Sequence, residues 1–523
     1  MQEFSPLQEK RLHYSTELPK VLQNIRKVTL KYGKGAPSSK EVKALFPKTH
    51  SQKIVEVVAQ KTGAFRRKAM RVGVVFSGGQ APGGHNVVTG LFDALKELHK
   101  ENRLFGFLGG PSGIVSDKKI ELTLDTLKNY RNQGGFDLLG SGRTKIETLQ
   151  QLQGACKSCK DLQGLVIIGG DDSNTNAALL AEHFLQENID AKVVGIPKTI
   201  DGDLKNEHIE IPFGFDTACK VYAELIGNIE RDALSSKKYT HFIRLMGRSA
   251  SHITLECALT SYPNIALFSE EVASKKMTLD TVASYLAEKI QKRRGRQKEY
   301  GVILIPEGLI EFIPEVKTLI SELNALLAKG SFAFAQLSNA SQRCYQSLPE
   351  GIQKQLLLDR DPHGNVQVSK IETEKLLAEM VRKKLGTLST VEHFFGYEGR
   401  SALPSNFDAN YCYALGYMGA LLIQEGVTGY IACIGNLHKK ITEWKVKGVP
   451  LTSMLHIESR HGKDKAVIKK ALVDLKGAPF AAFKMIRSKL EIEDHYRYMG
   501  PIQYYGSSDL VNSVPLSILY NYK

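Results

Sequence analysis

The segment KTIDGD, residues 198–203, concentrates charged and hydroxyl side chains directly after a short apolar run. Val193–Ile196 predict the end of a buried strand, which Pro197 terminates. Lys198 there faces two carboxylates, Asp201 and Asp203, a combination suited to binding an anion and accepting a proton. An ordinary Asp-Gly turn is the alternative that this stretch alone leaves open.

Two further loops follow apolar runs in the same way. SGGQAPGGHN, residues 77–86, offers backbone N–H groups to an anion at the start of a helix, although it fits neither common phosphate-loop pattern and a plain turn stays possible. GGDDS, residues 169–173, supplies carboxylates of the kind that Mg²⁺ shares with phosphate. Helix capping by Asp and Ser explains the same residues, and both roles are compatible.

Arginines and a glutamate follow other apolar runs, in GSGR (140–143), LMGRSASH (245–252), IPEG (305–308) and GYEGR (396–400). A guanidinium group binds phosphate through two parallel hydrogen bonds, although each arginine alone could form a surface ion pair. Together with aspartates for a metal and a base, these loops indicate phosphoryl transfer.

The elements that must position these loops alternate between short apolar strands and helical segments from Arg71 onward. Such alternation predicts a doubly wound, mostly parallel α/β sheet, in which ligands bind beyond the carboxyl ends of the strands. A second α/β series begins near Phe213, and residues 312–384 have a helical pattern. We therefore expect two Rossmann-like α/β domains with a helical insertion and extensions at both ends.

The length and amino-acid composition limit the classes of protein to which the chain can belong. The chain has 523 residues, 42% of them apolar, and no apolar run long enough to span a membrane. The first twenty residues lack a signal-peptide core, which favours a cytoplasmic protein. Seven cysteines, an odd number, suit free thiols in a reducing compartment. Cys156 and Cys159 form one C-x-x-C without the second pair that zinc would need.

The net charge of +15 is unevenly distributed, with 16 Lys and Arg against 5 Glu in residues 1–71. A second basic run covers Lys289–Lys298. Nucleic-acid binding is an alternative, but the second run resembles the solvated end of a helix and has few aromatic residues. The positive charge equally suits small, multiply anionic ligands.

Seven segments in order carry a resemblance to a known family: GGDDSNTNA, PKTIDGDL, FGFDTACK, RLMGRSASHITLECAL, GVILIPEGL, RDPHGNVQVSKIETEKLL and HFFGYEGR. The chain resembles the pyrophosphate-dependent 6-phosphofructokinases, in the long form of which the plant catalytic β-type subunit is an example. The resemblance extends from about Arg71 to Gly477, and more weakly into both ends.

The resemblance implies reversible phosphoryl transfer from pyrophosphate to O1 of fructose 6-phosphate, with Mg²⁺, giving fructose 1,6-bisphosphate and phosphate. It implies the phosphofructokinase fold and a homodimer or higher oligomer with shared active sites, without nucleic-acid or membrane partners. The expected parts are an N-terminal extension (1–70), a pyrophosphate and Mg²⁺ domain (71–212 with 395–450) and a sugar-phosphate domain (213–394 with 451–523), the latter with its helical insertion at about 312–385.

Residue by residue, the resemblance makes Asp201 the general base beside Thr199 and Ile200, with Asp171 and Asp203 near the metal. It assigns Gly79 and Arg143 to the phosphate donor. The expected sugar-phosphate contacts are Met246, Gly247, Arg248, Glu307, Tyr397, Glu398, Gly399 and Arg400. Lys238 and Tyr239 match a pair that reaches into the neighbouring subunit's site.

Two residues bear on the choice of donor. ATP-dependent relatives usually carry glycine where this chain has Asp172 and Lys198. A carboxylate at 172 would repel an additional phosphate, and the ammonium of Lys198 would favour a small pyrophosphate leaving group. The alternatives are an ATP-dependent phosphofructokinase and a non-catalytic regulatory subunit of the same family, against which the intact PKTIDGD and GGDDS loops argue.

Overall fold

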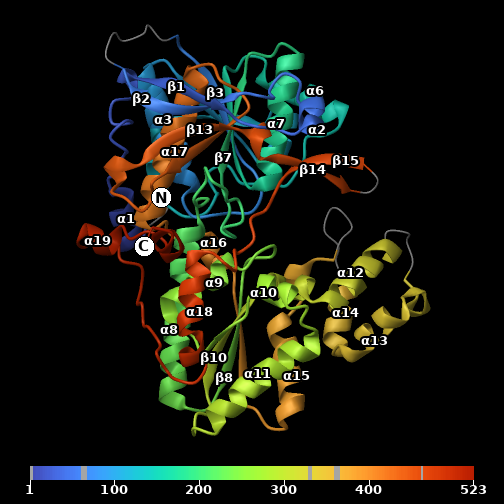
Figure 1. The fold of residues 1–523 in the computed structure, drawn as a ribbon. Helices are drawn as coiled ribbons and strands as arrows, with labels where there is room; N and C mark the ends of the chain where they lie inside the picture. The colour runs from blue at the N-terminus through green and yellow to red at the C-terminus, as the bar shows by residue number, and fades with distance from the viewer. Residues whose placement is uncertain (1–3, 61–67, 328–331, 359–365, 461–462, 523) are drawn as a thin grey trace.

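The computed structural model describes residues 4–60, 68–327, 332–358, 366–460 and 463–522, arranged as two stacked α/β bodies (Figure 1). Outside the described residues lie parts of the predicted N-terminal extension and helical insertion, and the beginning of the segment RDPHGNVQVSK, at 360–365. Within the described ranges, no helix combines the length and apolar character needed to cross a membrane.

The larger body contains a nine-stranded sheet whose central strands, β12, β7, β6, β3 and β4, are parallel. In β3, Val72, Val74 and Phe76 pack with the helices α3 (Gly84–Leu98) and α17 (Asn406–Gln424). Val75 faces the opposite core, with α6 (Leu149–Cys159) and α7 (Asp171–Gln186). Apolar side chains on both faces explain the near-continuous apolar runs of the sequence. In sheet order the strands are β1 (Val28–Gly35), β2 (Lys53–Ala59), β13 (Lys445–Pro450), β12 (Tyr430–Gly435), β7 (Lys192–Pro197), β6 (Gly164–Gly169), β3 (Arg71–Phe76), β4 (Arg103–Phe107) and β5 (Lys119–Leu122).

The smaller body contains a four-stranded parallel sheet, also covered on both faces. Ile243 and Leu245 of β8 pack with α8 and α9, and Phe242 packs with α11. This confirms the predicted pair of doubly wound α/β bodies. In sheet order the strands are β11 (Thr390–Phe395), β8 (Thr240–Leu245), β10 (Gly301–Pro306) and β9 (Ile265–Ala266).

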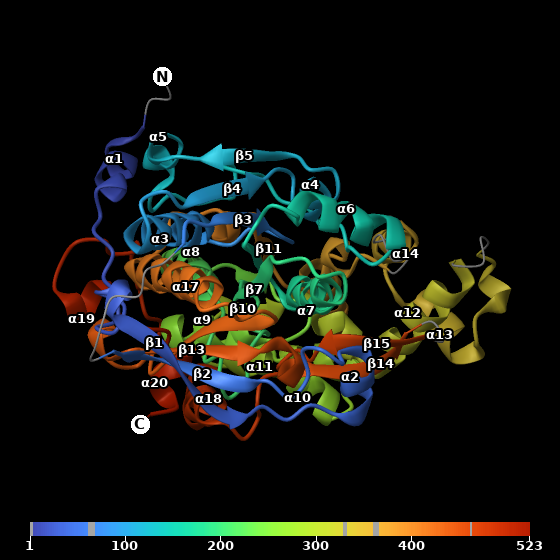
Figure 2. The ribbon, with the colours of Figure 1, turned by 90° about the horizontal axis from the view of Figure 1, so that it is seen from above.

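The helices divide between the two bodies. Of those in the insertion, α12, α13 and α14 project to one side, whereas α15 packs beside α11 on the small sheet (Figures 1 and 2). Those of the larger body include α2 (Lys40–Leu45), α3 (Gly84–Leu98), α4 (Pro111–Val115), α5 (Leu124–Leu127), α6 (Leu149–Cys159), α7 (Asp171–Gln186) and α17 (Asn406–Gln424). Those of the smaller body include α8 (Phe215–Ser236), α9 (His252–Ser261), α10 (Ser269–Ser274), α11 (Leu279–Arg294) and α18 (Ala478–Leu490). The insertion carries α12 (Pro314–Leu327), α13 (Asn339–Ser347), α14 (Glu350–Leu357) and α15 (Thr373–Leu385). The remaining helices are α1 (Pro6–Leu12), α16 (Tyr397–Arg400), α19 (Ser508–Val511) and α20 (Leu516–Tyr520).

The structure differs from the expected organisation at two places. The N-terminal extension supplies β1 and β2 to the large sheet, because β2 pairs with β13 through Glu56 and Val55. The hairpin of β14 (Leu455–Arg460) and β15 (Lys463–Ile468), predicted with the second domain, belongs to the larger body instead. Its apolar residues Leu455 and Ile468 pack in the core shared with α7, whereas the later helices α18 and α20 pack on α9 of the smaller body.

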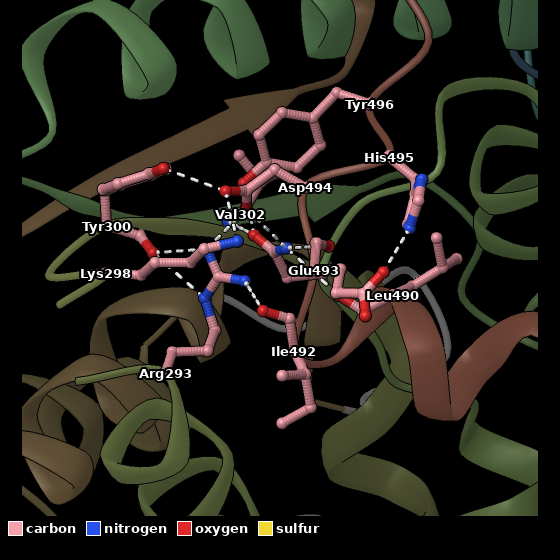
Figure 3. A network of polar contacts seen from close by, with 11 residues as sticks. Arg293, Lys298, Tyr300, Val302, Leu490, Ile492, Glu493, Asp494, His495 and Tyr496 are labelled. Atoms are coloured by element: carbon pink, nitrogen blue, oxygen red, sulfur yellow. Dashed lines mark hydrogen bonds and ion pairs between the residues drawn. The ribbon is translucent and has the colours of Figure 1, made fainter. Parts of the chain in front are cut away.

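A polar network holds the segment after α18 against the amino end of the small sheet (Figure 3). Asp494 Oδ1 lies 2.8 Å from Arg293, and its Oδ2 accepts hydrogen bonds from Lys298 at 2.8 Å and Tyr300 at 2.9 Å. Gly301, the first residue of β10, donates to the carbonyl of Tyr239 at 3.2 Å. The network therefore fixes the segment that carries the predicted intersubunit residues.

We expect Asp494→Asn to lower the free energy of unfolding by about 3 kcal/mol, because Arg293, only 2% exposed, would lose its counter-charge. Thermal and denaturant unfolding of the full chain measure this loss. Glu493→Gln is the matched control, because Glu493 pairs with His495 at the surface. Equal shifts of the unfolding midpoint in the two variants would contradict a structural role for the buried carboxylate.

Candidate active site

Three neighbouring strands of the large sheet, β7, β6 and β3, end in the predicted polar loops at one edge. Lys198 donates its backbone N–H to Gly169 O at 3.0 Å, and Ser77 donates to Ile168 O at 2.8 Å. Ser173 Oγ, in the first turn of α7, lies 2.8 Å from Ser77 Oγ. The loops KTIDGD, GGDDS and SGGQ therefore form one continuous surface, as expected at the carboxyl edge of parallel strands.

A cavity of about 420 Å³ lies over this edge. Arg248, from the loop after β8, and Arg400, at the end of α16, line it together with residues of the larger body, so both bodies contribute. The predicted site residues that line it are Gly79, Arg143, Asp171, Asp172, Lys198, Thr199, Ile200, Asp201, Asp203, Arg248 and Arg400.

Carboxylates gather on one side of the cavity. Asp203 is 3% exposed, and this burial, together with the charge of Asp201, raises its pKa to about 7. Glu307, directly after β10, does not line the cavity but is close enough for the charge of Asp201 to act on it. It is also 3% exposed, and burial followed by Asp201 raises its pKa to about 7. Its Oε1 atom has no hydrogen-bond partner in the described part of the chain. A buried carboxylate oxygen in this state suits a hydroxyl group of a ligand.

Cations gather near the glycine loop. Burial, and then the neighbouring charge of Arg400, lowers the pKa of Lys198 to about 8. Gly78 has φ +88°, a conformation that favours glycine, and a Cβ there would lie 3.3 Å from Lys198 Nζ. Burial, followed by Arg248 and Arg400, lowers the pKa of Arg143. This clustering of like charges beside backbone N–H groups is typical of a site for a multiply charged anion.

Arg400 lies next to Gly79 and Arg143, the two residues predicted to bind the phosphate donor. A Cβ on Gly79 would be 3.4 Å from Arg400 Nη1 and 3.8 Å from Arg143 Nη2. The resemblance assigns Arg400 to the sugar 6-phosphate, whereas the structure places its guanidinium beside the glycine loop. Tyr397, Glu398 and Gly399 precede it in α16 and do not line the cavity.

Asp172 occupies the outer part of the cavity. Its Oδ1 atom lies 2.9 Å from Lys145 Nζ, and its side chain is 57% exposed. Its partner Lys145, from the segment after the GSGR loop, was not singled out in the sequence. The carboxylate therefore lies at the rim of the cavity and not on its floor.

The residues of the smaller body that are predicted to contact the sugar phosphate lie on neighbouring loops. Gly308 donates its N–H to Gly247 O at 3.2 Å, and a Cβ on Gly308 would lie 1.8 Å from Arg248 O. Glycine at 308 is thus required for the loops after β8 and β10 to meet. Met246 is buried, with its Cε 3.1 Å from a Cβ on Gly396. The loop at Met246–Arg248 therefore contacts two other segments: the loop after β10, which carries Glu307, and the segment that leads to Arg400.

Lys238 and Tyr239 lie elsewhere. They precede β8, whereas the cavity is at the opposite, carboxyl end of that six-residue strand. Tyr239 is 38% exposed. Within one chain they are not brought to the cavity, and their expected reach into another subunit stays a prediction.

Lys470 is the cavity residue that sequence reasoning missed most clearly. Its Nζ lies 3.7 Å from Asp171 Oδ2, 3.6 Å from Asp203 Oδ2 and 2.8 Å from Ser249 Oγ. It follows β15 in the stretch VIKKALV, which looks like ordinary solvated lysines. No short-range pattern in the sequence distinguishes it.

A divalent cation fits the carboxylates that are present. Asp171 and Asp203 come from different loops, and their oxygens both approach the cationic group of Lys470. Among the described residues, no cluster of three or more His, Cys, Asp or Glu side chains could hold a metal alone. Mg²⁺ commonly takes only one or two carboxylates and completes its shell with phosphate oxygens and water, so this donor set suits it.

Comparison with known proteins agrees with this geometry. A sequence model of the phosphofructokinase family matches residues 71–423. The chain is 50% identical over 521 residues to a pyrophosphate–fructose 6-phosphate 1-phosphotransferase subunit beta 1 of Arabidopsis thaliana, covering 96% of this chain and 92% of that protein. It is 49% identical over 540 residues to the Treponema pallidum pyrophosphate–fructose 6-phosphate 1-phosphotransferase, covering 96% and 94%.

Among solved structures, a pyrophosphate-dependent phosphofructokinase from Nitrosospira multiformis has a TM-score of 0.57, with 17% identity, 85% of this chain and 96% of that chain covered. At this identity the likeness concerns the fold. It agrees with the two stacked α/β bodies described above.

Proposed function

The chain belongs to the phosphofructokinase family, and we propose that it transfers a phosphoryl group reversibly from pyrophosphate to O1 of fructose 6-phosphate. The products are fructose 1,6-bisphosphate and phosphate. The observation that carries this proposal is the buried ammonium of Lys198 against Gly78, with the carboxylate of Asp172 at the rim. The ammonium favours a small, highly charged leaving group, and the carboxylate disfavours the additional phosphate of a nucleotide.

Asp201 is the group that accepts the proton of the sugar's 1-hydroxyl. It lines the cavity beside Thr199, whose Oγ1 accepts the Asp201 N–H at 3.1 Å, so the loop is locally braced. As the bond between the phosphoryl group and its leaving oxygen lengthens, the attacking hydroxyl becomes more acidic. An ordinary carboxylate therefore suffices as a base.

Asp171 and Asp203 would hold Mg²⁺ together with the phosphates. When bound, Mg²⁺ neutralises charge on the transferred group and on the leaving phosphate. Gly79, Arg143 and Lys198 supply the remaining positive charge and N–H donors on the donor side. Arg400, beside Gly79, is placed to reach both the donor and the 6-phosphate of the sugar.

The sugar phosphate binds toward the smaller body. Glu307 is suited to accept a sugar hydroxyl through its unpartnered Oε1, beside the backbone of Met246 and Gly247. Ile200 and Arg248 line the same cavity, and Tyr397, Glu398 and Gly399 form the short helix that presents Arg400. We place the donor domain in residues 71–212 with 395–450 and the hairpin at 455–468, and the sugar domain in 213–394 with the remaining tail.

We propose an assembly of at least two copies, because Lys238 and Tyr239 lie at the end of β8 remote from their own cavity. A cytoplasmic location is also proposed. All seven cysteines of the sequence are described and free, which suits a reducing compartment.

The proposed function is tested with the purified full-length protein, fructose 6-phosphate and Mg²⁺, with pyrophosphate and ATP supplied in parallel assays. We expect turnover with pyrophosphate and formation of pyrophosphate from fructose 1,6-bisphosphate and phosphate in reverse. Turnover with ATP as efficient as with pyrophosphate would contradict the donor assignment. Absence of turnover with either donor would favour the alternative that the chain is a non-catalytic regulatory subunit.

Arg400→Ala should raise the KM for fructose 6-phosphate by about 10-fold or more, because an arginine bound to an unreacting phosphate contributes equally before and during reaction. Since its guanidinium also lies beside Gly79, we expect a smaller rise in the KM for pyrophosphate. Initial rates at varied concentrations of each substrate measure both. A rise confined to pyrophosphate would assign Arg400 to the donor alone.

A further inference from the structure

The segment between β15 and α18 crosses from the larger body to the smaller one, and its Lys470 lines the cavity. Ile468 donates its N–H to Thr175 Oγ1 of α7 at 3.2 Å, and Ala471 donates to Asp203 O at 2.7 Å. On the smaller body, His252 Nε2 lies 2.9 Å from Ala471 O, and Val473 donates to Glu270 Oε1 at 3.0 Å. We call residues 468–473 the crossing strap.

Lys470 points from this strap into the cavity. Its ammonium lies 3.6 and 3.7 Å from the carboxylate oxygens of Asp203 and Asp171, beyond ordinary hydrogen-bond length. Within the described part of the chain, the contact with Ser249 Oγ at 2.8 Å is its one hydrogen bond. An ammonium has three N–H donors, so two of them stay available to a ligand.

The side chain of Lys470 is not what holds the strap. Main-chain groups of Ile468, Ala471 and Val473 make the contacts with both bodies, and none of them depends on the ammonium. The cavity already contains Lys198 and three arginines. Packing therefore does not explain why a further positively charged side chain, that of Lys470, lies there.

We propose that Lys470 is a catalytic residue that binds oxygens of the phosphoryl group in transfer, and that the chain recruits it from outside the 71–423 region that matches the phosphofructokinase family. The inference rests on the proposed function. In the step, the bond from sugar O1 to phosphorus forms, and the bond from that phosphorus to the bridging oxygen breaks. The hydroxyl proton passes to Asp201, inorganic phosphate leaves, and Lys470 keeps all its protons.

Charge explains how Lys470 could exchange partners. Before the substrates bind, Asp171 and Asp203 balance its ammonium. Asp171 and Asp203 would hold Mg²⁺ when it is bound, and the phosphate oxygens of pyrophosphate would then be the nearest free acceptors for Lys470. An ion pair at about 4 Å in a partly buried site is attractive with either partner, so the exchange is electrostatically feasible.

The test compares Lys470→Met with Lys469→Met in the full-length protein, because Lys469 is the adjacent, exposed lysine. Binding of pyrophosphate is titrated by calorimetry with Mg²⁺ but without sugar phosphate, so no transfer occurs. We expect Lys470→Met to bind pyrophosphate about 10-fold more weakly and to lose about 100-fold in kcat/KM, the scale for losing one preorganised donor to a developing charge. Lys469→Met should match the parent protein, and Lys470→Arg should recover part of the loss.

The outcomes separate the possible roles. Turnover of the parent protein with pyrophosphate is measured first, so a failure of the proposed function is seen independently of Lys470. Pyrophosphate binding and kcat/KM within twofold of the parent in Lys470→Met would overturn the inference. Unchanged pyrophosphate binding with tighter Mg²⁺ binding would also overturn it, because Lys470 would then only balance the carboxylates. If Lys470→Met lowers the melting temperature, the smaller change Lys470→Gln is used for the same two titrations.

Discussion

Replacing Asp201 by asparagine should lower kcat by on the order of 10²–10⁴, the range for loss of a positioned general base. The amide keeps the shape of the side chain but cannot take the proton of the 1-hydroxyl. Among the other aspartates that line the cavity, Asp171 and the buried Asp203 face Lys470, and Asp172 pairs with Lys145 at the rim. The KM for fructose 6-phosphate should change only a few-fold, since the loop is braced by Thr199.

Steady-state rates in both directions measure this effect, with sugar-phosphate binding followed separately by calorimetry. Asp201→Ala serves as the second variant, and a loss of similar size in both would attribute the effect to the carboxylate. The melting temperature should change little, because Asp201 repels the carboxylates of Asp203 and Glu307 but attracts the cations of Arg248 and Lys198. Near-normal turnover in either variant would remove Asp201 from the role of base.

The elements that could be predicted from the sequence are those whose pattern is local. The strand at Arg71–Phe76 and the helix at Gly84–Leu98 follow from apolar runs and helical periodicity. The pairing of Lys53–Ala59 with Lys445–Pro450 is different, because it joins residues almost 400 positions apart and no periodicity specifies a partner. For the same reason, the sequence pattern does not indicate that the hairpin at 455–468 packs on the larger body.

In the candidate site, too, some residues could be predicted from local sequence patterns and others could not. Residues on strand-end loops were predictable because parallel strands bring such loops to a common edge, as with Asp171, Lys198 and Asp201. Lys470 was not, since its place in the cavity depends on how the crossing strap passes between two bodies.

Donor choice should reside in Asp172 and Lys198, on adjacent strand-end loops. We expect Asp172→Gly, alone or combined with Lys198→Gly, to lose most activity with pyrophosphate, and the double variant to gain measurable activity with ATP. Removal of the carboxylate opens the rim of the cavity and releases Lys145, whose Nζ lies 2.9 Å from Asp172 Oδ1. The released ammonium could then approach an additional phosphate. Removal of Lys198 withdraws the charge that lies against Gly78 and favours a small leaving group.

The measured quantity is the ratio of kcat/KM for ATP to kcat/KM for pyrophosphate, because a loss of folded protein lowers both values and leaves their ratio unchanged. Asp190→Gly is the matched control. Asp190 is 70% exposed and lies 3.1 Å from Lys192, an ion pair like that of Asp172 with Lys145, but it does not line the cavity. We expect the ratio to rise by about 100-fold or more in the double variant, since two charge effects of about 1.4 kcal/mol each multiply to that factor. The gain in absolute ATP activity can be small, because the two substitutions create no contacts for adenine. A ratio that stays at the parent value in the double variant would show that donor selection lies elsewhere, with Arg143 and Lys145 the next residues to replace.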